Sequence, residues 1–402
     1  MRASSISLIV VFLAFLGAPG AAWLLGAEGG DASLQNRATT VPTKFSWTAA
    51  WDGSFAKDVD AFVWDRVPFR APFLKLEHAL SSRLFRDSPV PGVIVVGDGD
   101  FEYVKDRSVG PHGGWVDAKR LDRTLTNIER AFDDAGVPLF LVISPTKAVA
   151  HPERMPPGLR RVFDATVQVV SDRLEHRAQS DKHIVPLWAV FRAERERLRT
   201  ADVADDRLRT LFRAHDLHWN VEAGRLQAKA IVDAVAPGIW DARCVPVLDG
   251  RFVELDPELK NIYTKIGPTE PYQGIAVAPG VVLKREKPPA KQSSAYAATS
   301  ACATSPRRLA VVRDSFLNAA ADEPAPAQDG GIQTIASFFA ASTFVHWDAV
   351  ATDTARAERA LAGADVVVIQ VVQANLGNLI THEKKLIAIA RAMNRSGHPR
   401  PP

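Results

Sequence analysis

The segment Leu309-Ala310-Val311-Val312-Arg313-Asp314-Ser315-Phe316 runs from an apolar stretch directly into a serine. A continuous apolar run of this kind predicts a strand that is covered on both faces, as in a parallel sheet. An α/β fold usually presents a nucleophile at the end of such a strand. Ser315 is therefore the first candidate for a reactive group.

The flanking sequence predicts the other parts of an α/β fold. The stripe Leu121, Leu125, Ile128 and Phe132 has helical spacing, and Gly136 ends this helix before an apolar strand over 137–143. Such an α-to-β step is typical of a parallel sheet flanked by helices. Further elements are predicted as buried strands at 184–187, 309–312 and 365–372, a hairpin at 93–104, and a helix at 221–235 with Asn220 as its N-cap.

Two regions have a different character. Aromatic residues recur over 45–85 in polar, helix-compatible sequence, and their spacing favours amphipathic helices packing on the domain over a carbohydrate-stacking surface. From 246 to 306 the strand and helix pattern breaks. Prolines, a basic-proline patch over 284–291 and a Ser/Ala tract over 293–305 predict an irregular insertion before the nucleophile strand.

The composition is that of an ordinary globular protein. The chain has 402 residues, enough for one large or two modest domains, with 47% hydrophobic and 24% charged residues. Its 49 basic and 46 acidic residues leave a formal charge of +3, and no basic stripe is interleaved with aromatic residues. Nucleic acid is therefore not expected as a partner.

The N-terminus predicts export from the cytoplasm. Residues 6–26 carry no charge, Arg2 precedes them, and Glu28 and Asp31 follow them, which places the N-terminus on the cytoplasmic side. The apolar length approaches the ~20 residues that span a bilayer. We therefore favour a signal anchor over 1–26 in the inner membrane, although the small residues over 17–22 also permit cleavage as a signal peptide. A small and polar linker over 27–44 would follow.

Two cysteines, Cys244 and Cys302, occur in the exported part. An even number of cysteines in an oxidising compartment permits a disulfide, and this pair brackets the predicted insertion. The alternative is two unrelated buried thiols. We favour the disulfide.

A second motif, Asp216-Leu217-His218-Trp219, lies about a hundred residues before Ser315. A serine nucleophile needs an imidazole to take its proton, and the imidazole needs a partner on its other nitrogen. His218 and Asp216 supply these groups, and Trp219 could limit access of water. The alternative is that His215 and His218 bind a metal, but no third ligand occurs at a recognisable spacing, so neither a metal nor a cofactor is expected.

The two motifs together resemble the alginate O-acetylation SGNH-hydrolase-like family (AlgJ/AlgX type). Three further segments resemble that family: 62–70 with 84–89, 95–101, and 142–147 with 151–153. The resemblance covers most of residues 45–380. It implies an SGNH-like α/β catalytic domain over 45–390, with a flexible tail over 391–402 and no appended carbohydrate-binding module, as in the membrane-anchored members.

The resemblance also implies a function. Ser315 would be the nucleophile, His218 the base and Asp216 the orienting acid of a periplasmic O-acetyltransferase that modifies a secreted polysaccharide. A membrane-bound O-acyltransferase would supply the acetyl group. The alternatives are a carbohydrate acetylesterase with the same triad and a non-catalytic polysaccharide-binding or assembly subunit.

The chain departs from the family pattern at several positions. Arg313 stands where the family usually has Gly, and it could restrict the nucleophile or recruit an anionic sugar. Amides such as Gln373 stand near the last strand, where the family tends to carry Glu and Arg; they could stabilise an oxyanion or simply end the strand, and we favour the second. Phe316, Trp219 and Lys147 are further candidates for oxyanion or substrate contacts.

Overall fold

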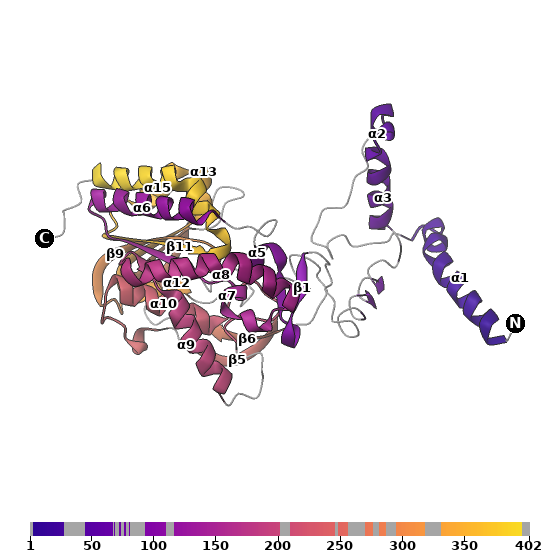
Figure 1. Ribbon diagram of the computed structural model, residues 1–402, viewed down its shortest axis with the longest axis horizontal. Helices are drawn as coiled ribbons and strands as arrows, with labels where there is room; N and C mark the ends of the chain where they lie inside the picture. Colours follow the sequence, from indigo (N-terminus) through magenta and orange to yellow (C-terminus); the bar gives the residue numbers. More distant parts are fainter. Residues whose placement is uncertain are drawn as a thin grey trace. The chain divides into compact units, whose positions relative to one another are not determined.

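The computed structural model (Figure 1) describes residues 3–27, 45–66, 68, 72–73, 76–77, 80, 93–109, 116–201, 210–245, 248–255, 270–275, 281–286, 295–317 and 331–395. The chain divides into two units. One comprises Met1–Ile94 and Asp256–Pro268, and the other comprises Val95–Leu255 and Thr269–Pro402. The predicted active-site residues all belong to the second unit.

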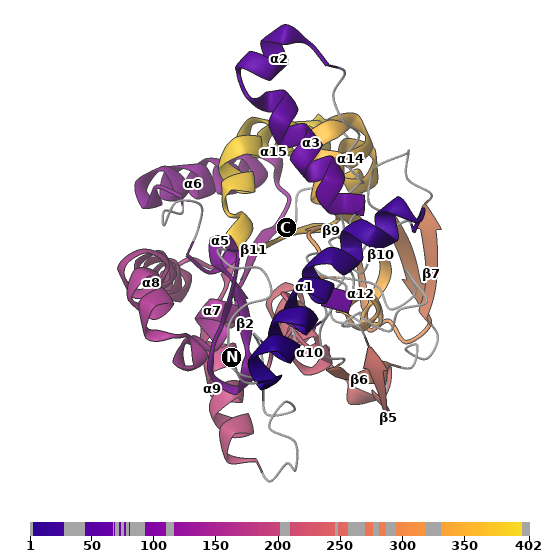
Figure 2. The ribbon, with the colours of Figure 1, turned by 90° about the vertical axis from the view of Figure 1, so that its right-hand side faces the viewer.

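The second unit is built on a seven-stranded sheet, in which five consecutive strands are parallel and two antiparallel strands extend one edge. Figure 2 shows β7 at that edge. The strands in spatial order are β4 (Ile184–Val185), β3 (Leu139–Ser144), β11 (Val366–Val372), β9 (Ser305–Arg313), β10 (Phe339–His346), β8 (Ala295–Ser300) and β7 (Val281–Glu286). The predicted α/β fold with a mostly parallel sheet is confirmed.

Helices cover both faces of this sheet because the central strands are apolar on both sides. In β11, Val367 and Ile369 pack into one core cluster, whereas Val366 and Val368 pack into the other. The first cluster includes residues of α6 (Ala118–Ala135), α13 (Trp347–Thr352), α14 (Thr354–Leu361) and α15 (Gly377–Arg395). The second includes residues of α8 (Pro157–Ser180), α9 (Leu187–Thr200), α10 (Val221–Val235) and α12 (Gly331–Ala336). Figure 1 shows α6 and α15 side by side on one face, with α10 and α12 on the other.

Local sequence signals set several element boundaries as predicted. Gly136 ends α6 in the left-handed conformation, with φ of 70°. The Asn220 side chain caps α10 by accepting a hydrogen bond from the Ala223 N–H. The predicted hairpin forms from β1 (Ile94–Val96) and β2 (Glu102–Val104), with a 3₁₀ turn at Asp98–Asp100. Two short helices, α5 (Lys105–Val109) and α7 (Lys147–Ala150), follow β2 and β3.

The stretch predicted as an irregular insertion differs from that expectation, because its described residues form four strands. β5 (Leu248–Leu255) and β6 (Glu270–Ile275) form an antiparallel pair, and β7 and β8 join the main sheet. Pairing with β10 decides the conformation of the Ser/Ala-rich β8, which has little apolar pattern of its own. The predicted disulfide between Cys244 and Cys302 is present.

The described residues of the N-terminal unit are mostly helical. It contains α1 (Ala3–Leu24), α2 (Trp47–Trp51) and α3 (Ser54–Arg66), so helices do form in the aromatic-rich region, although most of residues 67–85 lie outside the described residues. Phe45 packs edge-to-face on Trp47 and on Phe55.

The described residues contain no helix that is both long and apolar enough to cross a membrane, so the predicted anchor over 1–26 gains no support from the structure. Residues 28–44 of the predicted linker (27–44) and residues 396–402 of the predicted tail (391–402) lie outside the described residues. The first residues of the predicted tail are helical, because α15 continues past residue 390 to Arg395.

Candidate active site

Ser315 lies in a tight turn at the carboxyl end of β9. The Leu317 N–H donates to the Asp314 carbonyl oxygen at 3.2 Å, and the Phe316 N–H donates to Asp314 Oδ1 at 2.9 Å. Ser315 and Phe316 are thus the two central residues of a turn that begins immediately after the strand. Because Asp314 already binds the Phe316 N–H, that backbone group is committed to the turn and is not a ready oxyanion donor.

Buried hydrogen bonds tie this turn to the neighbouring strand β11. Asp314 Oδ2 accepts the Val372 N–H at 2.6 Å, and Asp314 Oδ1 accepts Gln370 Nε2 at 2.9 Å. In return, Gln370 Oε1 accepts the Asp314 N–H at 2.9 Å. Both side chains are buried. Charge-assisted hydrogen bonds are strong when they are buried, so these bonds fix the position of the turn relative to β11.

The same network continues to β3 and α10. Gln370 Nε2 donates to Ser144 Oγ at 2.9 Å, and the Ser144 hydroxyl donates to Gln227 Oε1 at 2.6 Å. Gln227 Nε2 then reaches the Phe316 carbonyl oxygen at 3.4 Å. Hydrogen bonds from β11, β3 and α10 therefore hold the nucleophile turn in place.

The second motif lies in the loop that leads into α10. An isolated antiparallel bridge between Phe212 and Trp219 closes this loop. The Leu211 N–H donates to His151 Nε2 at 3.0 Å, and His151 Nδ1 lies 3.2 Å from Glu153 Oε1. Burial lowers the pKa of His151, which favours the neutral ring that this arrangement requires. His151 therefore supports the loop.

Ser315, His218 and Asp216 lie within hydrogen-bonding distance of one another in the order that nucleophilic catalysis requires. His218 Nε2 is 2.9 Å from Ser315 Oγ, and His218 Nδ1 is 3.2 Å from Asp216 Oδ1. Asp216 Oδ1 also accepts the His218 backbone N–H at 2.9 Å. Asp216 is buried, whereas the His218 side chain is 19% exposed. With a proton on Nδ1, Nε2 can accept the Ser315 proton.

Two buried cations hold the loop that carries Asp216. Arg213 Nη1 donates to Asp216 Oδ2 at 2.7 Å. Lys147 Nζ donates to the carbonyl oxygens of Ala214 at 2.6 Å and Asp216 at 3.1 Å. The ammonium group also lies 4.6 Å from the centre of the Phe101 ring. The contacts of Lys147 are those of a residue that supports the acid loop.

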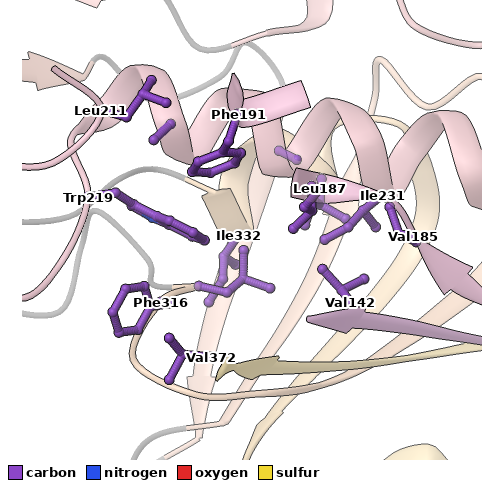
Figure 3. Packing of buried hydrophobic residues seen from close by; sticks show 14 of the residues in the cluster. Val142, Val185, Leu187, Phe191, Leu211, Trp219, Ile231, Phe316, Ile332 and Val372 are labelled. Atoms are coloured by element: carbon purple, nitrogen blue, oxygen red, sulfur yellow. The ribbon is translucent and has the colours of Figure 1, made fainter. Parts of the chain in front are cut away.

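Aromatic side chains form the wall beside the triad. The Phe316 ring lies 4.8 Å from the His218 ring and meets Trp219 at right angles, with 5.1 Å between the centroids. Figure 3 shows Trp219 between Phe191 and Phe316. Trp219 is fully buried. It therefore packs behind the site in the core, and Phe316 is the ring in contact with the imidazole.

Arg313 and Gln373 are both buried and both bonded to other groups. Arg313 Nη1 donates to the carbonyl oxygens of Leu317 at 3.1 Å and Asp314 at 3.5 Å. Gln373 Nε2 donates to Ser171 Oγ at 2.5 Å, and Gln373 Oε1 accepts a hydrogen bond from Trp188 Nε1 at 3.4 Å. The Gln373 side chain therefore contacts both α8 and α9.

His215 and His218 face different groups. His215 Nδ1 lies 3.3 Å from Glu102 Oε1 on β2, whereas His218 faces Ser315. Within the part of the chain that the structure describes, no cluster of three or more His, Cys, Asp or Glu side chains could hold a metal ion.

The sequence does not point to Arg213, Gln227 or Ser144 as parts of the site. Gln370 is, with Gln373, one of the amides near the last strand that could stabilise an oxyanion or simply end the strand, and the structure shows its side chain bonded to Asp314. Arg213 lies three residues before Asp216 in a segment with no apolar periodicity. The available signal was positional: Gln370 and Ser144 both end, or nearly end, strands of the parallel sheet, where polar side chains gather.

No family model and no curated protein matches the chain. Several solved structures are similar. The O-acetyltransferase domain of Pseudomonas putida AlgJ has a TM-score of 0.42 and 15% identity, covering 70% of this chain and 91% of that one. Bacillus cereus PatB1 with a sulfonyl adduct has a TM-score of 0.45 and 12% identity, covering 71% and 97%. Pseudomonas aeruginosa AlgX has a TM-score of 0.38 and 11% identity, covering 73% and 67%. At these values the similarity carries no argument about residue roles.

Proposed function

We propose that this protein is an O-acetyltransferase that acts on a secreted polysaccharide through an acetyl-serine intermediate. The observation that carries the proposal is the continuous contact from Ser315 Oγ to His218 Nε2 and from His218 Nδ1 to Asp216 Oδ1, at 2.9 and 3.2 Å. The motif resemblance to the alginate O-acetylation family, on the same three residues, supports acetyl transfer as the reaction.

The chemistry follows from the positions of the protons. As Ser315 Oγ attacks the carbonyl carbon of an acetyl donor, His218 Nε2 takes the hydroxyl proton, and Asp216 stabilises the imidazolium that forms. His218 then gives the proton to the departing group, which leaves an acetyl ester on Ser315. In the second half, His218 takes a proton from a sugar hydroxyl that attacks the ester, and it returns a proton to Ser315 Oγ.

The partners in this proposal are a polysaccharide acceptor and a membrane-bound O-acyltransferase that delivers the acetyl group. The setting is the periplasm. Support for an oxidising compartment comes from the Cys244–Cys302 disulfide, because disulfides are rare in cytosolic proteins. The charge pattern around residues 6–26 supports export of the remainder of the chain.

Intact-mass spectrometry after incubation with an activated acetyl ester tests the proposal. The full chain should gain one acetyl group that maps to Ser315, and Ser315→Ala should gain none. Ser180→Ala is the matched control, since Ser180 is an exposed serine at the end of α8. Folded wild type that never acquires the group over a range of pH would refute acyl transfer and favour a binding or assembly subunit.

Product analysis with acetylated enzyme and oligosaccharides then separates transfer from hydrolysis. Acetylated sugar is the expected product. Release of free acetate alone, at the same rate with and without sugar, would identify an esterase instead.

A further inference from the structure

Arg213 makes a buried ion pair with the acid of the candidate triad. Its Nη1 lies 2.7 Å from Asp216 Oδ2, and the two side chains are 8% and 3% exposed. A buried carboxylate without a paired cation is costly, so this contact favours the ionised form of Asp216. The ionised form is the one that can stabilise an imidazolium.

The contacts of Asp216 are divided between its two oxygens. Oδ1 accepts both the His218 backbone N–H and Nδ1, at 2.9 and 3.2 Å, whereas Oδ2 accepts Arg213. A carboxylate can rotate about its last bond, and a donor on Oδ2 restricts that rotation. Arg213 therefore keeps Oδ1 directed at His218.

The same guanidinium also reaches beyond the acid. Arg213 Nη2 donates to the Trp219 carbonyl oxygen at 3.4 Å, directly after the base His218. The planar guanidinium thus connects residues on both sides of the base. Lysine cannot reproduce this arrangement, because an ammonium group lacks the fixed fork of donors.

We propose that Arg213 is a positioning residue of the acyl-transfer centre: it holds Asp216 ionised and aims its Oδ1 at His218 Nδ1. This inference rests on the proposed function. It assigns to Arg213 an effect on the imidazole and no contact with the acetyl donor or the sugar.

Steady-state kinetics with an activated acetyl ester are the first test. Arg213→Gln should lower kcat by about tenfold or more, the scale of a lost charge-assisted hydrogen bond, with KM nearly unchanged. Removing a cation near the imidazole should also shift the acidic limb of the kcat/KM profile to higher pH. Arg213→Lys should restore the position of the limb and only part of the rate.

The control is Arg197→Gln. Arg197 also pairs with a carboxylate three residues away, Glu194, but on the exposed surface of α9. It should leave the rate and the pH profile unchanged. A folded Arg213→Gln variant with wild-type kcat and pH profile would overturn the proposal.

A double-mutant cycle covers the case in which loss of Arg213 weakens folding. In the Asp216→Asn background the buried charge is gone, and Arg213→Gln should then have little further effect on kcat. A second loss of tenfold in that background would show that Arg213 acts independently of Asp216, against the proposal.

Proton NMR separates failure of this inference from failure of the proposed function. The downfield Nδ1–H resonance of His218, identified by its loss in His218→Ala, should move or broaden in Arg213→Gln whether or not the protein transfers acetyl groups. An unchanged resonance would overturn the positioning role, and absence of acetyl-Ser315 in wild type would instead overturn the proposed function.

Discussion

Arg313 is the residue at which the sequence departs most clearly from the family that its motifs resemble, and its contacts give it a structural role. The guanidinium donates to the carbonyl oxygens at both ends of the nucleophile turn, those of Asp314 and Leu317. It also lies 5.4 Å from the centre of the Tyr296 ring on β8. It is 3% exposed, so it braces the turn from within and is poorly placed to recruit a sugar from solvent.

We therefore expect Arg313→Gly, which places there the residue usual in the family that the motifs resemble, to impair the protein. Loss of two buried hydrogen bonds should lower the free energy of unfolding by about 1–3 kcal/mol and slow acetylation of Ser315. Thermal unfolding and time-resolved mass spectrometry measure the two effects. Arg307→Gly, also in β9, is the control: it places a glycine in the same strand and removes one hydrogen bond, to the Val235 carbonyl oxygen, but no contact with the turn. Faster acetylation of Arg313→Gly than of wild type would contradict the bracing role.

At the scale of residues, the three triad residues could be predicted because few residue types can act as nucleophile, base and orienting acid. The roles of their supports could not. Lys147 was a candidate only for an oxyanion or substrate contact. Lys147, Gln370 and Arg213 are residue types found on any surface, and only the folded chain buries them beside the two motifs. Hydrogen bonds such as that from Gln370 to Asp314 join residues 56 positions apart, so no local pattern reports them.

At the scale of elements, the strands with continuous apolar sequence were predictable and those without it were not. β3 and β11 carry such runs, whereas β8 and β10 contain small residues: Ala295–Ser300 reads A-Y-A-A-T-S and Phe339–His346 reads F-A-A-S-T-F-V-H. Their conformation depends on pairing with neighbours, since alanine and serine have weak strand preference. Composition alone therefore suggested an irregular insertion where the structure has strands.

The disulfide between Cys244 and Cys302 connects the 3₁₀ turn Ala242–Cys244, which follows α10, to the turn between β8 and β9. Its sequence separation of 58 residues corresponds to about 4 kcal/mol of stabilisation in the chain-entropy description. It lies near the amino end of β9, and Ser315 follows the carboxyl end. Replacing both cysteines with serine should lower the melting temperature clearly and leave acetylation of the folded protein unchanged.

Differential scanning calorimetry and adduct formation well below the melting temperature check these two expectations. An unchanged melting temperature would show that the bridge adds no stability. Loss of acetylation in the folded variant would show that the insertion and the nucleophile turn are coupled.

At the scale of the whole molecule, the candidate site and the stabilising contacts occupy different parts of the sheet. The triad is assembled from the carboxyl end of β9 and the loop before α10, with supports from β3 and β11. A separate ion-pair network joins Glu129 of α6 to Arg177 of α8 at 2.6 Å. Arg177 also bonds Asp181 at 2.9 Å. The stability of the fold can therefore depend on pH through groups outside the site.

Glu129 should make global stability fall as pH rises from mildly acidic to neutral. Burial raises the pKa of its carboxyl from 4.5 to about 7, although the Arg177 charge opposes this. Between these values the unfolded chain loses the proton while the folded protein keeps it, so the folded state binds more protons and its stability decreases with pH. The contribution of Glu129 to the free energy of unfolding is complete below about pH 4.5 and is lost by about pH 7. It amounts to about 3 kcal/mol.

Glu129→Gln isolates this contribution, because the amide keeps the shape of the protonated acid and does not titrate. Urea unfolding of wild type and variant between pH 4.5 and 8 gives the difference in free energy of unfolding at each pH. We expect wild type to lose stability relative to the variant as pH rises, since ionising the buried carboxyl opposes folding. A difference that instead grows in favour of wild type with pH would mean that the ion pair with Arg177 outweighs the cost of burial, and that the folded state holds Glu129 ionised.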